Sequence, residues 1–133
     1  MARDLKIQDN VSFEINASRN QLFDIFQRAK VAIHTMKDEH FGIAIVELMS
    51  SGIITVAHDS AGPRSDIIGP SPKPVGYLAQ NQSDYCEFVK KALINYDQAE
   101  HVEMRRNARH WVRDQFGLAT FDSKFVNQLK QLL

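Results

Sequence analysis

The stretch that decides the fold runs from residue 31 to residue 57 and reads VAIHTMKDEHFGIAIVELMSSGIITVA. Its first four residues predict a short apolar strand, a polar loop follows, and residues 42–51 form an apolar run of helical length. Gly52 stands where such a helix would end, as a C-cap, and the β-branched run 53–57 predicts a strand buried on both faces. The order strand, helix, strand predicts a parallel sheet in which the helix is the crossover.

The flanking segments extend this alternation. Residues 11–15 alternate apolar and polar side chains and predict a strand, and residues 76–79 predict another. Four strands are therefore expected in an α/β, Rossmann-like parallel sheet flanked by helices. Helices are expected over 19–29, capped by Ser18 or Asn20, over 83–96, capped by Ser83 and Asp84, over 98–115 and over 119–132.

Length and composition limit the class of protein. The 133 residues suit a single domain spanning 1–133, and 16 basic against 16 acidic residues give a net charge of zero. This balance argues against a nucleic-acid binder that acts through bulk charge. The single cysteine, Cys86, cannot form an internal disulfide, so a reducing compartment fits best. No apolar stretch reaches the roughly 18–20 residues that span a bilayer, so this chain is expected to be soluble.

Two polar loops are expected at the edge of the sheet where ligands bind in this fold class, residues 35–41 and residues 58–66. Gly42 lets the backbone approach a ligand closely, and the free N–H groups of the helix that follows suit a phosphate group. Glu39 and Glu47 flank this helix start, and carboxylates there can hold the hydroxyls of a sugar or a ribose. The sequence therefore predicts a nucleotide-sugar site.

Ordinary structural roles compete with this interpretation. Glu39 equally fits a loop carboxylate favoured by the helix dipole. Glu47 equally fits a surface glutamate, but apolar neighbours all round predict a buried helix, and a buried carboxylate needs a partner. Common structural roles would also account for the remaining polar residues. His34 and His40 would be solvated or structural imidazoles, Asp66 would be a helix cap, and Gly62-Pro63 would form a turn. The arginines at 105, 106, 109 and 113 would lie on a solvated helix face. The spacing of acidic and histidine residues around the first loop matches no zinc or calcium loop, so no metal site is expected.

At these residues the sequence resembles the donor-binding half of the GT-B glycosyltransferases of family 4. The family motif E-x-F-G-x-x-x-x-E is met by Glu39, Phe41, Gly42 and Glu47. The family's glycine-rich second loop is similar to Ser60, Gly62 and Asp66, although Ala61 replaces its first glycine. The context of His34-Thr-Met36 and of Glu39 to Ile43 is similar to the family members that are α-1,2-mannosyltransferases using GDP-mannose.

The resemblance implies a retaining transfer of mannose from GDP-mannose to a dolichol-diphosphate-linked oligosaccharide. Glu39 would contact the donor mannose as the catalytic carboxylate, and Glu47 would bind the ribose of GDP. The donor would also contact His40, Phe41, Gly42 and Ile43, with no metal or other cofactor. The parent enzyme would lie at the cytosolic face of the endoplasmic reticulum membrane. This chain would be a soluble, cytoplasmic C-terminal fragment, inactive alone because the acceptor-binding domain and the first strands of the donor domain are missing.

Two other functions fit the same residues. A truncated, non-catalytic module could bind a partner through an exposed edge of its incomplete sheet. A family 4 enzyme that uses another nucleotide sugar would keep the same two glutamates.

Overall fold

The computed structural model describes residues 1–132. Its centre is a parallel sheet whose three strands lie in the order β1 (Val31–His34), β2 (Ile54–His58) and β3 (Tyr77–Ala79). Val31 pairs with Ile54, and Val56 pairs with Tyr77. The first four residues of β2 are fully buried because this strand has a neighbour on each side. The α/β class and the parallel order predicted from the sequence are therefore confirmed.

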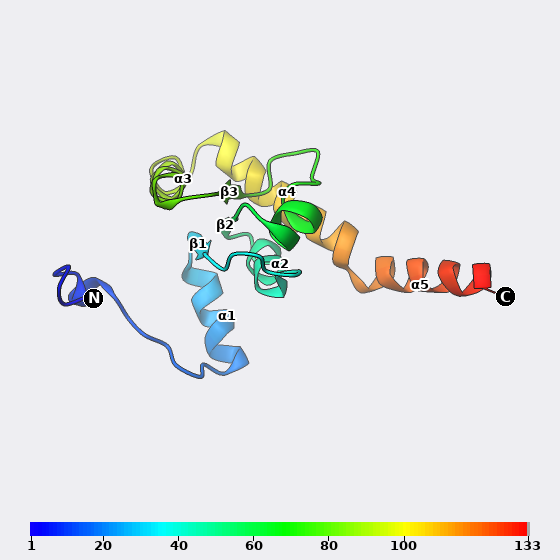
Figure 1. Ribbon diagram of the computed structural model, residues 1–133, viewed down its shortest axis with the longest axis horizontal. Helices are drawn as coiled ribbons and strands as arrows, with labels where there is room; N and C mark the ends of the chain where they lie inside the picture. Colours follow the sequence, from blue (N-terminus) through cyan, green and yellow to red (C-terminus); the bar gives the residue numbers. More distant parts are fainter. Residues whose placement is uncertain (133) are drawn as a thin grey trace.

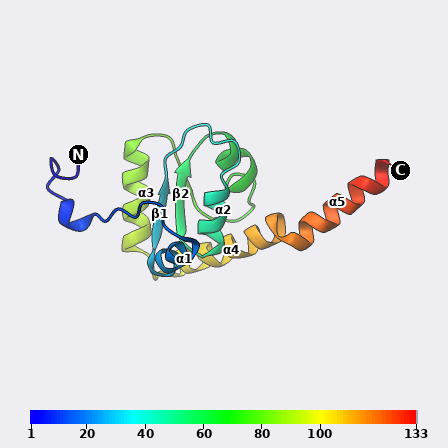
Figure 2. The same ribbon diagram turned by 90° about the horizontal axis from the view of Figure 1, so that it is seen from below.

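Helices cover both faces of this sheet. Figure 2 shows α2 (Ile43–Ser50) on one side of the strands and α3 (Gln82–Ile94) on the other. The core agrees, because Ala57 of β2 belongs to a cluster with Ile45 and Met49 of α2, whereas Ile54 belongs to a second cluster with Ala92 of α3.

The described chain has three further α-helices. The longest, α4 (Ala99–Phe116), packs against α2, and α1 (Arg19–Arg28) leads into β1. The last helix, α5 (Leu118–Leu132), extends away from the sheet at the C-terminal end (Figures 1 and 2). Two short turns complete the fold, η1 (Gln8–Asn10) and the π-helical η2 (Pro63–Ile67). Within residues 1–132, no helix combines the length and the apolar character needed to cross a membrane.

Helix ends show how well local signals predict boundaries. Ser18 caps α1 through a capping box with Gln21, and Gly52, with φ of 77°, follows α2 as expected. The predicted caps of α3 were wrong by a few residues. Asn81 is the cap because its backbone is extended and its side chain accepts a hydrogen bond from the Asp84 N–H.

The predicted strand over residues 11–15 is absent. This segment has no strand partner in the described chain, and the side chains of Phe13 and Ile15 are 77% and 82% exposed. Alternation of apolar and polar residues favours a strand only where a sheet edge supplies backbone partners and a face to cover. The sheet of residues 1–132 therefore has three strands instead of four.

Candidate functional site

Two loops meet at the carboxyl end of the sheet, as parallel strands require. The N–H of Gly62 donates to the carbonyl of Glu39 at 2.8 Å, and the N–H of Asp38 donates to the Ser60 hydroxyl at 2.9 Å. The same hydroxyl lies 2.9 Å from Nδ1 of His58 at the end of β2. These contacts fasten the loop after β1 to the loop after β2.

Gly62 is required by the close approach of these loops. A Cβ atom at this position would collide with the carbonyl oxygens of His40 and Phe41, which are backbone atoms and cannot move aside independently. Ala61, beside it, has a φ of 36°, a left-handed conformation that favours glycine. The second loop thus supports the backbone of the first.

Free backbone donors begin α2. Gly42 is the N-cap residue with a φ of 101°, and its carbonyl accepts hydrogen bonds from the N–H groups of Ile45 and Val46. In the described chain, the N–H groups of Ile43 and Ala44 have no acceptor. The structure therefore has a helix N-terminus with unsatisfied donors beside the first loop, which is the arrangement that binds phosphate groups.

Phe41 contributes its ring to packing and its backbone to this helix start. The ring meets that of Phe116 of α4 edge-on, with ring centroids 5.5 Å apart. Both rings line an apolar groove of about 530 Å³, which Phe121 and Phe125 of α5 also line. The Phe41 side chain therefore anchors the loop to α4.

Glu47 is exposed, so the expectation that it is buried was wrong. The apolar residues of α2 are not covered on every side, because only the face carrying Ile45 and Met49 packs into the core. Ile43, four residues before Glu47, is 70% exposed, and residues four apart share a helix face. Glu47 thus stands on the open face of α2, one turn beyond the free N–H of Ile43.

Glu39 lies in a more enclosed position than Glu47. Its side chain is 23% exposed, and its Oε2 atom is 3.9 Å from Nε2 of His34, the last residue of β1. The neighbouring His40 is exposed. Glu39 thus lies in the loop between β1 and the start of α2, whereas Glu47 lies on the exposed face of α2 itself.

Asp66 does not join this group through any contact in the described chain. It lies exposed in η2, which is held in place by the indole N–H of Trp111 donating to the carbonyl of Ile67 at 2.6 Å. The predicted N-cap role is not seen, because the N-cap of this turn is Gly62.

Several supporting residues were missed from the sequence. Tyr85 of α3 donates its hydroxyl to the carbonyl of His34 at 3.0 Å, and Asp59 accepts from the side chain of Gln80 at 2.8 Å. The first contact joins residues 51 positions apart, so no local pattern could reveal it. Asp59 and Gln80 each directly follow a strand, and this position could have marked these two as residues of the same edge.

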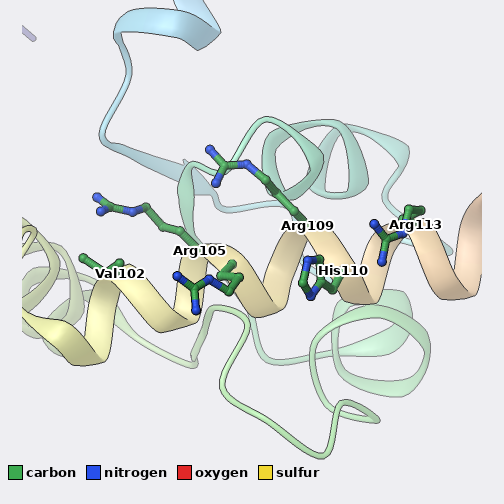
Figure 3. A pocket seen from close by; sticks show the side chains of 6 residues that line it. Val102, Arg105, Arg109, His110 and Arg113 are labelled. Atoms are coloured by element: carbon green, nitrogen blue, oxygen red, sulfur yellow. The ribbon is translucent and has the colours of Figure 1, made fainter.

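A second concavity runs along α4, far in sequence from these loops. Figure 3 shows Arg105, Arg109 and Arg113 following one another along this helix, and they border a groove of about 460 Å³. Arg109 donates to the carbonyl of Ser51 at 3.3 Å, and the guanidinium of Arg105 lies 3.8 Å from the ring centre of Tyr96. Arg105 therefore packs against Tyr96, and Arg109 hydrogen-bonds the C-terminal end of α2. Both contacts go beyond the solvated role expected from the sequence.

Within residues 1–132, no group of three or more His, Cys, Asp or Glu side chains is placed to hold a metal ion.

Comparison with known proteins gives relatives along the whole chain. The chain is 38% identical over 133 residues to the Dictyostelium discoideum protein named GDP-Man:Man(3)GlcNAc(2)-PP-Dol alpha-1,2-mannosyltransferase, covering 100% of this chain and 25% of that protein. It is 33% identical over 133 residues to the Homo sapiens protein of the same name, covering 99% and 27%. The chain thus spans about a quarter of the length of these relatives.

Solved structures show the same fold at low sequence identity. A glycosyltransferase from Rickettsia africae superposes with a TM-score of 0.84 and 17% identity, covering 98% of this chain and 34% of that one. Anabaena HepE in complex with UDP superposes with a TM-score of 0.82 and 18% identity, covering 98% and 35%. The architecture is therefore that of part of a GT-B glycosyltransferase.

A family profile settles the assignment. Residues 1–111 match the family described as glycosyl transferases group 1, which includes the whole sheet, both loops and the start of α2. The chain belongs to the group 1 glycosyltransferases.

Proposed function

We propose that this chain is the donor-binding part of an α-1,2-mannosyltransferase that takes mannose from GDP-mannose. The acceptor would be a dolichol-diphosphate-linked oligosaccharide, bound by parts of a longer protein. The names of the relatives, which match along the whole chain, support this substrate pair. Because such an acceptor is a membrane lipid, the reaction would take place at a membrane, for which we propose the cytosolic face of the endoplasmic reticulum.

One observation supports the donor site: the free N–H groups of Ile43 and Ala44 at the start of α2 lie, in the sequence, between the carboxylates Glu39 and Glu47. A diphosphate accepts hydrogen bonds from such donors and is favoured by the helix dipole. Glu39, on the loop side, would hold the mannose hydroxyls and stabilise charge as the glycosidic bond breaks. Glu47, one turn along the open face of α2, would accept hydrogen bonds from the ribose hydroxyls.

The backbone supplies the remaining donor contacts in this proposal. Phe41 packs against Phe116 and Gly42 has a positive φ, which supports a fixed backbone from His40 to Ile43 that would face the sugar and the diphosphate. Transfer would retain the configuration of the anomeric carbon and would need no metal, because the helix N-terminus and basic residues would offset the diphosphate charge.

A binding role without catalysis is the second candidate. It is favoured by β1, an edge strand of the sheet, whose Ile33 side chain is 54% exposed beside a small apolar hollow with Tyr85 and Val89. An unpaired strand edge is a template for another chain. Self-association that rises with concentration, in the absence of nucleotide binding, would support this role.

Titration of GDP-mannose by calorimetry tests the donor site, with UDP-glucose as the competing donor. We expect saturable binding of GDP-mannose and a loss of about tenfold or more in affinity in Glu47→Ala, since a hydrogen bond to a charged group is worth about 1.5–3 kcal/mol. Glu87→Ala is the matched control, because Glu87 is an exposed glutamate of α3. Its affinity should equal that of the unchanged chain.

Other outcomes are equally informative. Preference for UDP-glucose would favour a group 1 enzyme with another donor. Equal losses in Glu47→Ala and Glu87→Ala would contradict the ribose role of Glu47. No binding of either nucleotide sugar by a folded chain would count against the donor site and leave the binding role.

A further inference from the structure

His34 is the ionisable side chain that stands against Glu39. It ends β1, its side chain is 17% exposed, and its Nε2 atom lies 3.9 Å from Oε2 of Glu39. No lysine or arginine in residues 1–132 comes within ion-pair distance of Glu39. Within residues 1–132, the imidazole is therefore the basic side chain that lies within ion-pair distance of this carboxylate.

The environment of the ring decides where its proton lies. Nδ1 of His34 is buried and has no hydrogen-bond partner in the described chain. A neutral imidazole has one N–H donor and one bare acceptor nitrogen. A proton on Nδ1 would leave a buried donor unpaired and would turn the lone pair of Nε2 toward the carboxylate. A proton on Nε2 leaves Nδ1 as a bare buried acceptor, which is tolerated better than an unpaired buried N–H, and it directs a donor at Glu39.

The backbone of His34 is fixed by both the sheet and α3. His34 is paired with Ala57 in the sheet, and its carbonyl accepts the Tyr85 hydroxyl of α3 at 3.0 Å. Glu39 lies in the loop between β1 and α2. A ring mounted on a strand can thus set the direction of a carboxylate mounted on a loop.

We propose that His34 is a positioning residue for Glu39, which it holds toward the donor sugar through the proton on Nε2. This role rests on the proposed donor site. The 3.9 Å separation is longer than a direct hydrogen bond, so the contact would tighten when the donor is bound, as catalytic hydrogen bonds commonly do.

Imidazole ¹⁵N–¹H correlation spectra of the whole chain test the pairing without any ligand. His34→Gln identifies the His34 signals among the five histidines by their loss. At a pH where imidazole is neutral, we expect the proton on Nε2, and we expect both Nε2 and its proton to shift when Glu39→Ala removes the carboxylate. Glu47→Ala is the control and should leave these signals in place.

Donor binding tests the consequence with two amides of different length. His34→Gln keeps an N–H donor near the position of Nε2, whereas His34→Asn places its amide near the position of Nδ1. We expect His34→Gln to bind GDP-mannose nearly as the unchanged chain does and His34→Asn to bind roughly tenfold more weakly. In the Glu39→Ala background, His34→Asn should cause no further loss, because the group it positions is gone.

The outcomes separate this proposal from the donor site. A proton on Nδ1, or His34 signals unchanged by Glu39→Ala, would overturn the positioning role even if GDP-mannose binds. Additive losses in the double variant would also overturn it. If no variant binds GDP-mannose, the donor site fails, and the spectra still decide whether His34 is paired with Glu39.

Discussion

At the scale of the residue, the second loop depends on Gly62 having no side chain. Gly62→Ala would drive a Cβ atom into the carbonyl oxygens of His40 and Phe41. Because backbone must move to make room, we expect a loss of about 1–3 kcal/mol in the free energy of unfolding. Urea denaturation followed by circular dichroism measures it.

The neighbouring Ala61 supplies the control with the opposite sign. With a φ of 36°, alanine bears a left-handed strain of about 1–2 kcal/mol, which glycine relieves at an entropic cost of about 0.5–1 kcal/mol. Ala61→Gly should therefore leave the free energy of unfolding unchanged or raise it by up to about 1.5 kcal/mol. Equal destabilisation by both substitutions would show that any substitution in this loop lowers stability, and it would contradict the steric explanation for Gly62.

At the scale of the element, η2 depends on α4 through one hydrogen bond. Trp111→Phe keeps an aromatic ring but removes the N–H that donates to the carbonyl of Ile67. Because Ile67 is buried and its carbonyl would lose this partner, we expect a loss of about 1–2 kcal/mol in unfolding free energy. Hydrogen exchange should report faster opening of residues 63–68 than of β2. Unchanged exchange there would mean that packing alone holds η2.

At the scale of the whole molecule, stability should fall in alkaline solution. Burial raises the pKa of Tyr77 above its ordinary value of 10.0, burial likewise raises the pKa of Tyr85, and the hydrogen bond to Glu100 raises the pKa of Lys91. A raised pKa in the folded state means that the folded chain holds the proton more tightly. This stabilisation is complete below the ordinary pKa and is lost as pH rises through the folded value.

The measurement is urea denaturation at about pH 8 and at about pH 11, on either side of these ordinary values. The free energy of unfolding should be lower at the higher pH. Tyr85→Phe should reduce the decline, since a residue without a hydroxyl cannot ionise. An identical decline in the variant would assign the effect to other groups.

The sequence predicted the elements that depend on local signals, but it did not predict features that depend on distant neighbours. The strand-helix-strand unit from Val31 to His58 follows from the spacing of apolar residues and from Gly52, which are local properties of the chain. The exposure of Glu47 and the absence of a strand at 11–15 depend on what covers a face or pairs with an edge. The contact between Asp38 and Ser60 spans 22 positions and exists because two strands are neighbours in the sheet.

The fastening of the two loops limits how this site can be re-engineered. The loop after β1 cannot be transplanted by itself into a related enzyme, because its backbone is hydrogen-bonded to Ser60 and Gly62 of the loop after β2. In chimeras that exchange residues 35–41 alone, the new loop would lie against a second loop whose hydrogen-bonding groups do not match it. Donor preference in this family should therefore be exchanged, and should evolve, in paired blocks of loop sequence.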